Sequence, residues 1–225
     1  MPQLHDALVR GVADSAQVRT DLLYRHALAH DASHFLLLPQ AVVTPANAAE
    51  VAALIQTTKA AGVGLAFRSG GTSLSGQGSS DQVLADVRSR FTDIVVLDGG
   101  TRVKVQPGVT VRRVNAHLAP YGYKLGPDPA SEVACTIGGV VANNSSGMAC
   151  GITENSYRTI ESLVIVLGSG TIIDTGQPDA DEQLRIKEPV IYEGLTKLRD
   201  RVNASPPAVA KITQQFSMKN TMGYG

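Results

Sequence analysis

Cysteine is scarce in this chain of 225 residues, and its two cysteines are Cys135 and Cys150. No CxxC pair occurs, so the chain by itself can form neither a zinc ribbon nor an iron–sulfur cluster. We expect both thiols to be reduced, as in a cytoplasmic protein. His26, His30 and His34 would share a metal-binding face only on one continuous helix, and the polar residues before His34 indicate that the helix ends first. We therefore predict no metal site.

Net charge is also lacking, because 20 lysines and arginines balance 20 aspartates and glutamates. This balance favours neither nucleic acid nor anionic lipid as a partner. No apolar run approaches the roughly 20 residues that span a bilayer, and the N-terminal residues contain no apolar signal-peptide core. We expect a cytoplasmic protein, with peripheral contact to the inner membrane left open.

Helical and strand periodicities are interleaved along the chain and predict an α+β fold. The expected helices are 4–30, 48–61, 110–118 and 189–202, with Asn47 and Thr110 as N-caps and Glu50 completing a capping box. The expected strands are 34–38, 63–67, 83–86, 94–97 and 103–105, followed by a hairpin of 163–167 with 171–174. This order is not a regular βαβ series, which favours two subdomains.

Glycine is abundant, and the first of its clusters follows the expected strand 63–67 as RSGGTSLSG at residues 68–76. Successive main-chain amides of such a loop can point inward and bind an anion. Gln77 and Gly78 stand where a Walker A motif requires lysine and a hydroxyl residue, so a P-loop is excluded. No GxGxxG follows a strand, so a Rossmann site is unsupported. A flexible surface loop is the alternative, but linkers rarely begin directly after a buried strand.

A second glycine cluster combines GPDPAS at 126–131 with TIGGVVANNSSG at 136–147. The prolines stiffen its first part, and the pair Gly138 and Gly139 would let the backbone lie against a flat ring or a phosphate. A helix that begins near Thr136 would direct its positive end toward an anion. The asparagines supply amide donors and acceptors suited to the edge of a heteroaromatic ring.

The loop at 68–76, followed by these two motifs, resembles the FAD-binding domain of the vanillyl-alcohol-oxidase (PCMH) type. The most similar branch is the D-2-hydroxyacid dehydrogenases, which include D-lactate dehydrogenases and the glycolate oxidase flavoprotein. NNSSGMACG and KNTMGYG resemble the long members of that branch, which carry a C-terminal iron–sulfur domain. The resemblance covers about residues 30–225. It implies two α+β subdomains with FAD between them, divided as an N-terminal helical segment 1–30, subdomains 31–110 (pyrophosphate loop 68–78) and 111–205, and the start of a missing substrate or cap region at 206–225.

The resemblance implies contacts to FAD from both clusters and from the segments beside them. The residues are Arg68, Ser69, Gly70, Gly71, Thr72, Ser73, Leu74, Gly76, Pro107, Gly108, Pro127, Ala130, Ser131, Ile137, Gly138, Gly139, Asn143, Ser145, Ser146, Gly147 and Ile165. Some relatives carry a covalently attached histidine where this chain has Thr72, so we expect non-covalent FAD. We interpret Cys150 as a small core residue rather than a second covalent anchor. Asp128 could steer the flavin or stabilise its own turn.

The function implied by the resemblance is that of an FAD-dependent oxidoreductase acting on CH–OH groups. Such an enzyme oxidises a D-2-hydroxyacid, such as D-lactate, glycolate or D-2-hydroxyglutarate, to the 2-oxoacid by hydride transfer to flavin N5. The resemblance places the catalytic base beyond this chain, so we name no catalytic residue, and the electron acceptor would be reached through an iron–sulfur region, a quinone or a cytochrome. We expect the chain alone to bind FAD weakly or not at all. The alternatives are the FAD domain of a sugar or aldonolactone oxidase and a non-enzymatic nucleotide-binding module.

Overall fold

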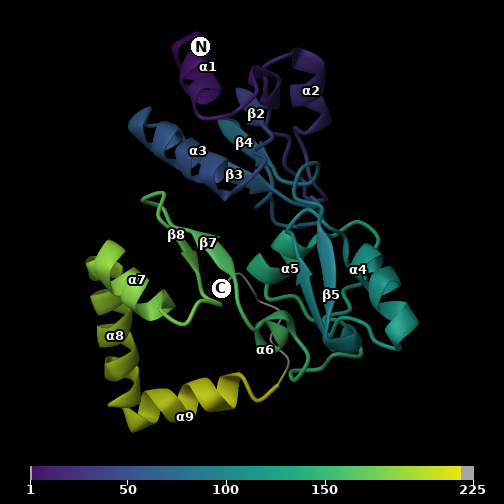
Figure 1. The fold of residues 1–225 in the computed structure, drawn as a ribbon, viewed down its shortest axis with the longest axis vertical. Coiled ribbons are helices and arrows are strands. Elements are labelled where there is room, and N and C mark those ends of the chain that lie inside the picture. The colour runs from purple at the N-terminus through teal and green to yellow at the C-terminus, as the bar shows by residue number, and fades with distance from the viewer. Residues whose placement is uncertain (1, 219–225) are drawn as a thin grey trace.

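The computed structural model describes residues 2–218, and its first half is built around a four-stranded sheet (Figure 1). The strand order is β1 (Val18–Arg19), β2 (Ala41–Val43), β4 (Val83–Asp86) and β3 (Leu65–Arg68). β2, β4 and β3 are parallel, and β1 is antiparallel to β2. Because parallel strands end at the same edge of a sheet, the loop after β3 begins at the edge where β2 and β4 also end.

The two central strands, β2 and β4, are buried on both faces because successive side chains point to opposite sides. Helices α1 (Pro2–Arg10) and α3 (Ala48–Ala60) cover one face, through a cluster of Leu8, Val18, Ala41, Val43, Leu54, Val83 and Ala85. The region of α2 (Leu22–Ala27) covers the other face, where Leu28 packs on Val42 and Leu84. This double cover holds rigid the sheet that carries the glycine loop.

The second half lies below the first in Figure 1 and contains two hairpins and three short helices. Its elements are the hairpins β5 (Ile94–Leu97) with β6 (Arg102–Val105) and β7 (Val164–Val166) with β8 (Ile172–Asp174), and the helices α4 (Val111–Leu118), α5 (Ile137–Ala142) and α6 (Ser156–Thr159). Val109, Val114 and Leu118 form the buried centre under the first hairpin. The mixture of helices and separate sheets confirms the predicted α+β class.

Three further helices form an L-shaped frame beside the second half (Figure 1). They are α7 (Ala180–Lys187), α8 (Pro189–Asn203) and α9 (Pro206–Gln215), and none of them has a fully buried side chain. The helix expected at 189–202 corresponds to α8, whereas α7 and α9 were not predicted. The motif KNTMGYG lies outside the described residues.

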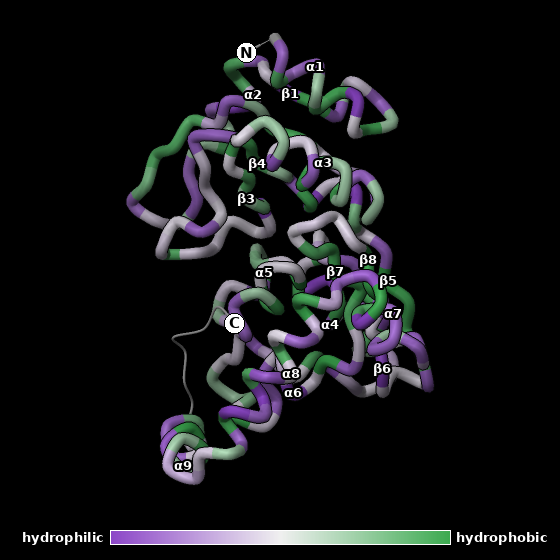
Figure 2. Tube along the Cα trace, turned by 90° about the vertical axis from the view of Figure 1, so that its left-hand side faces the viewer, coloured by the Kyte–Doolittle hydropathy of each residue, from purple (hydrophilic) through white to green (hydrophobic). Residues whose placement is uncertain are grey.

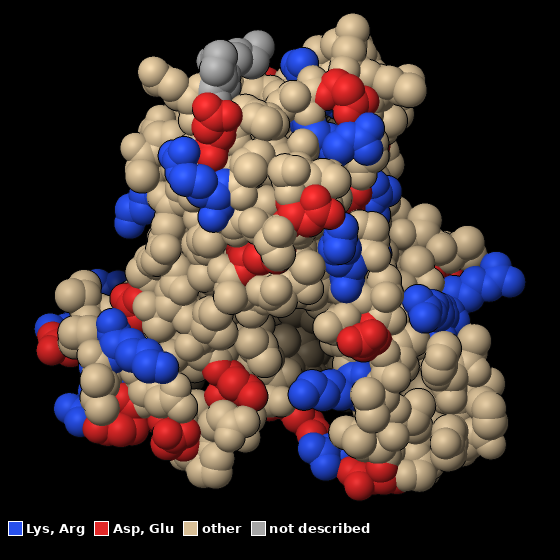
Figure 3. All heavy atoms as spheres, turned by 45° about the horizontal axis from the view of Figure 1, so that its top comes forward, with Lys and Arg blue, Asp and Glu red and all other residues tan. Residues whose placement is uncertain are grey.

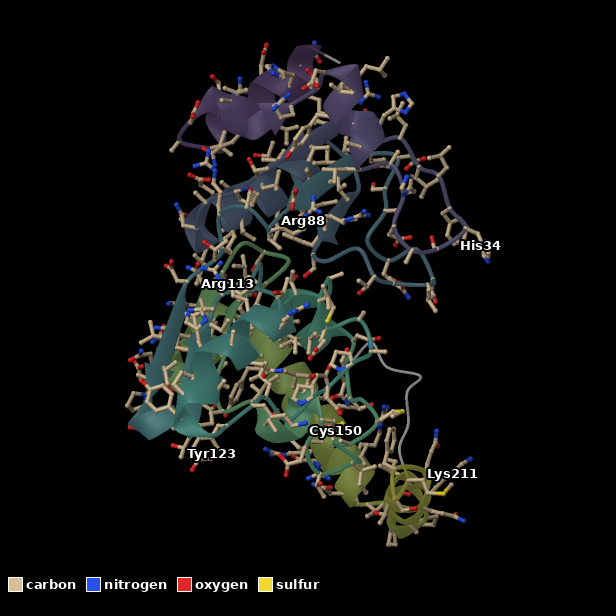
Figure 4. All side chains as sticks on the ribbon, turned by 90° about the vertical axis from the view of Figure 1, so that its right-hand side faces the viewer. His34, Arg88, Arg113, Tyr123, Cys150 and Lys211 are labelled. Carbon is tan, nitrogen blue, oxygen red and sulfur yellow. The ribbon has the colours of Figure 1, made fainter. Side chains whose placement is uncertain are left out.

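Two expectations for the first half are wrong. The helix expected at 4–30 is broken, because Asp14 caps a 3-10 turn at Ser15–Gln17 and the next two residues form β1 at the edge of the sheet. The strand expected at 34–38 is reduced to a single bridge between His30 and Leu36, because no neighbouring strand extends the pairing. In Figure 4, His34 points outward at the margin of the molecule. Since α2 ends at Ala27, the three histidines do not share a helical face.

Helix α3 begins as predicted, because the Asn47 side chain accepts a hydrogen bond from the Glu50 amide at 3.0 Å. The reciprocal bond of a capping box is not formed. The Glu50 carboxylate instead accepts bonds from Ala46 N at 2.8 Å, Ala13 N at 3.3 Å and Gln17 Nε2 at 2.7 Å. Glu50 is 7% exposed, so this carboxylate is a buried link between α3 and the N-terminal segment.

Both charge signs are interspersed over the face drawn in Figure 3, in agreement with the balanced composition. No helix within residues 2–218 is long and apolar enough to cross a membrane.

Candidate functional site

The structure brings the two glycine clusters together through the side chain of Ser69, the first residue after β3. Its Oγ accepts a hydrogen bond from the Gly139 amide at 2.9 Å and is paired with the Thr136 hydroxyl. Figure 2 shows α5 at the upper edge of the second half, next to β3. Residues about 70 positions apart in the sequence therefore meet at one junction. This meeting is what we expect if both glycine clusters contact the same ligand.

Close backbone approach explains the glycines at this junction. A Cβ atom at Gly70 would lie 2.4 Å from the Ala134 carbonyl oxygen, and one at Gly138 would lie 2.9 Å from Pro107 Cβ. A Cβ at Gly108 would lie 2.4 Å from the Val87 carbonyl oxygen. Real side chains do not tolerate such distances, so glycine at these positions lets the segments around 70, 108 and 138 pack against one another.

The first amides of α5 are used inside the protein. Ile137 N donates to Val109 O at 2.8 Å, Gly138 N donates to Pro107 O at 2.9 Å, and Gly139 N donates to Ser69 Oγ. Helix α5 does begin beside the loop, as expected, but these three donors are not available to an anion. This short helix can act on a ligand only through its weak partial charge.

Within the described residues, the first three amides after Ser69 have no acceptor. Among residues 2–218, the amides of Gly70, Gly71 and Thr72 donate to no protein acceptor. Gly71 has φ of 68°, a left-handed conformation that favours glycine and that lets successive amides converge. Farther along, Leu74 is 77% exposed at the tip of the loop. A half-buried run of three unpaired amides is a fitting cradle for a phosphate group.

The hydroxyl of Ser73 shapes the loop from within. It donates to the Gln77 side-chain oxygen and accepts a bond from the Ser75 amide at 3.2 Å. Ser69 and Ser73 are therefore held by protein groups.

The asparagine–serine segment is held by α6. The Asn144 Oδ1 atom accepts a hydrogen bond from Tyr157 N at 3.1 Å. The backbone of Asn144 is left-handed, with φ of 43°. Asn143 Nδ2 donates to Ser145 Oγ at 2.9 Å, and Ser156 Oγ donates to the Ser145 carbonyl at 2.8 Å. These contacts give 143–145 a defined shape.

Asp128 stabilises the turn that follows this segment. Its carboxylate accepts bonds from Ala149 N at 3.0 Å and Cys150 N at 3.2 Å. Burial pushes the pKa of Asp128 upward, but the amide bonds from Ala149 and Cys150 outweigh it, so the pKa lies below its ordinary value. A Cβ at Gly147 would lie 1.9 Å from the Asp128 carboxylate, which explains this glycine. These contacts join Asp128 to a segment more than 20 positions away and not to its own turn, so the predicted role in its own turn is not what the structure shows.

Neither cysteine has the environment of a reactive thiol. Cys135 and Cys150 are both buried and unbridged, and burial raises the pKa of the Cys135 thiol. In Figure 4, Cys150 lies in the second half.

The remaining predicted residues have different structural surroundings. Ser131 builds the turn before it, because its carbonyl accepts bonds from Ala134 N and Cys135 N at 2.8 Å. Pro127 is buried and Ala130 is exposed in the same segment. Ile165 pairs with Ile173 in the hairpin that packs on α3.

Sequence reasoning missed Thr136 as a member of the junction. Its hydroxyl contacts Ser69 and it is only 3% exposed. A hydroxyl residue at a helix start, two positions before a glycine pair, is the signal that could have found it.

Parallel strands that end in a glycine loop with free amides, opposed by a second glycine segment, are typical of a domain that binds a phosphate-bearing nucleotide cofactor. A family model described as "FAD binding domain" matches residues 39–176, more than half of the chain. The chain therefore belongs to the FAD-binding domain family.

Two curated relatives are similar to this chain in sequence. D-2-hydroxyglutarate dehydrogenase of Pantoea ananatis (strain AJ13355) is 31% identical over 155 residues, which cover 67% of this chain and 15% of that protein. Glycolate oxidase subunit GlcD of Escherichia coli (strain K12) is 32% identical over 148 residues, which cover 61% of this chain and 30% of that protein. The chain thus spans less than a third of the length of each relative.

Solved structures support the fold. An alkyldihydroxyacetonephosphate synthase superposes with a TM-score of 0.66 over 78% of this chain and 34% of that one, at 21% identity. The predicted PCMH-type FAD-binding fold is confirmed.

Proposed function

We propose that this chain is the FAD-holding portion of a flavin-dependent dehydrogenase that oxidises a D-2-hydroxyacid of the lactate, glycolate or 2-hydroxyglutarate type to the 2-oxoacid. The observation that supports it best is the meeting of the free-amide loop with the second glycine cluster inside an FAD-family domain. The names of the relatives in the preceding comparisons support the hydroxyacid class.

The residues present fit FAD. In this proposal the amides of Gly70, Gly71 and Thr72 bind the pyrophosphate, whose negative charge suits a site with unpaired donors above a buried arginine, Arg68. Gly138 and Gly139 let the second cluster approach Pro107 and Ser69 closely and so bring it next to the free amides. Bound FAD would supply the hydride-accepting group of the reaction.

The cofactor is expected to be non-covalent, because Thr72 stands where covalent relatives have a histidine. Thr72 has a hydroxyl and an amide but no nucleophilic ring nitrogen. The catalytic base and the route to an electron acceptor, whether an iron–sulfur centre, a quinone or a cytochrome, belong in this proposal to protein outside the chain.

The test is a flavin assay followed by a substrate panel. The purified protein is titrated with FAD, and the yellow absorbance is monitored before and after reduction by dithionite. D-lactate, glycolate and D-2-hydroxyglutarate are then offered to the longest natural form of the protein, with their L-isomers and an aldonolactone as controls. Bleaching by a D-2-hydroxyacid supports the proposal. Reduction by the aldonolactone alone, or failure of every form to bind FAD, would refute it.

A further inference from the structure

Arg68 joins both ends of the glycine loop to a segment upstream of the FAD domain. It is the last residue of β3 and is only 6% exposed. Its guanidinium donates to the Gly78 carbonyl at 2.8 Å and to the His30 carbonyl at 2.5 Å. One side chain thus spans the first and last residues of the loop and fastens them to the chain near residue 30.

The upstream segment, residues 30–36, lies against the outside of the loop as a strap. Ala32 N donates to the Gly71 carbonyl at 3.0 Å. Phe35 covers Gly76, since a Cβ atom there would lie 2.5 Å from the aromatic ring. The strap precedes the matched family region, which begins at residue 39. The strap therefore lies outside the part of the chain that matches the FAD-binding family.

The guanidinium of Arg68 lies against Gly71 of the loop. A Cβ atom at Gly71 would lie 2.7 Å from its Nε atom, which is buried and has no hydrogen-bond partner among the described residues. Burial and then the charge of Arg88 lower the pKa of Arg68, while Asp31 and Asp86 oppose this, and an arginine stays charged at neutral pH. In Figure 4, Arg88 lies in the upper half. Both terminal nitrogens of Arg68 are occupied by carbonyls, so its contacts to the protein already fix its position.

We propose that Arg68 is a positioning residue, which shapes the loop for a diphosphate by holding it between the 30–36 strap and β3. It acts through the main chain of the loop and not by its own contact with phosphate. The inference rests on the proposed FAD site. It assigns to the strap a function in cofactor binding that the sequence did not indicate.

The experiment compares Arg68→Met and Arg68→Lys with wild type and with Arg25→Met. Arg25 is a matched control, because its Nε donates to the Pro39 carbonyl at 2.5 Å on the strand side, away from the loop. Hydrogen exchange is measured without ligand at two amides that are bonded to the loop: Ala32 N, which donates to the Gly71 carbonyl, and Ser79 N, which donates to the Gly76 carbonyl. FAD affinity is measured by flavin fluorescence, and thermal melting reports global stability.

We expect both Arg68 variants to exchange the Ala32 and Ser79 amides about tenfold faster and to bind FAD about tenfold more weakly, because each loses at least one charge-assisted bond. Lysine keeps the charge but has no planar fork to reach two carbonyls. Arg25→Met should match wild type in both loop measurements. Recovery of FAD affinity by Arg68→Lys would show that charge alone matters and would overturn the proposal, as would unchanged loop exchange in Arg68→Met.

Phe35→Ala gives a second test that leaves Arg68 intact. Phe35 is 52% exposed, so its loss should not unfold the protein, yet it should loosen the loop at Gly76 and accelerate exchange of the Ser79 amide, which donates to the Gly76 carbonyl. Unchanged exchange of the Ser79 amide would contradict the role of the strap. If no form of the protein binds FAD, including the longest natural one, the proposed function fails, whereas the ligand-free exchange data still decide whether Arg68 and the strap shape the loop.

Discussion

Substituting alanine for Gly70 should force the two glycine clusters apart. The added Cβ would lie 2.4 Å from Ala134 O, 2.8 Å from Cys135 Cα and 3.0 Å from Thr136 N, all of them main-chain atoms. Gly70 does not have a positive φ, so the steric clash is the only backbone penalty. Relief to 3.0 Å requires a shift of about 0.6 Å, which a packed backbone resists.

The expected cost follows from this clash. Overpacking a tight site costs about 1–3 kcal/mol, and each kcal/mol lowers the melting temperature of a chain of this size by roughly 2–4 °C. We therefore expect Gly70→Ala to melt about 2–12 °C below wild type. Since the shift also separates Ser69 from Gly139, FAD affinity should fall more than stability alone would suggest.

Differential scanning fluorimetry and an FAD titration measure these effects. Gly168→Ala is the control, because a Cβ there meets nothing within 4 Å and its φ is not positive. If Gly70→Ala melts with the control and binds FAD as tightly as wild type, the close approach of the clusters does not exist in solution.

Two further substitutions and one flavin assay test separate parts of the structure. Glu50→Gln should cost about 1.5–3 kcal/mol in urea unfolding, because a neutral amide replaces a carboxylate that accepts three N–H bonds; a loss below about 0.5 kcal/mol would contradict the buried link. Asp128→Asn should destabilise the protein at pH 7 but not in acid. Its folded pKa lies below the ordinary value of about 3.9, so its contribution is present above that pH and disappears as pH falls through the folded pKa. A constant difference between the two proteins from pH 7 to pH 3 would exclude this role. Acid precipitation should leave all flavin in the supernatant, since Thr72 forms no covalent bond; fluorescence in the pellet would show otherwise.

Local signals in the sequence were sufficient for several elements. Thr110 caps α4 as predicted, with its side chain accepting a bond from the Arg113 amide at 3.2 Å. The strands β4 and β5 have the predicted bounds. These features depend on neighbours a few residues away, so periodicity and capping chemistry can reveal them.

Long-range pairing decided the elements that failed. Val18–Arg19 became a strand because β2 offered a free edge, although the surrounding residues have a helical pattern. The apolar run that includes Phe35 and Leu36 found no strand partner and stayed exposed. Strand formation depends on a partner that single-sequence patterns do not contain.

The sequence by itself determined the chemistry of the candidate site, because glycine at fixed positions and small polar side chains permit only a close, donor-rich loop. It also revealed the order of the two clusters. Only the tertiary structure decided how the donors are divided: Gly139 N is bound to Ser69, whereas the amides of Gly70 and Gly71 have no acceptor in the part of the chain that the structure describes. It likewise placed the Arg68 guanidinium against Gly71 of the loop. The hydrogen bond from Arg68 to the His30 carbonyl, 38 residues away, depends on the packing of the whole sheet.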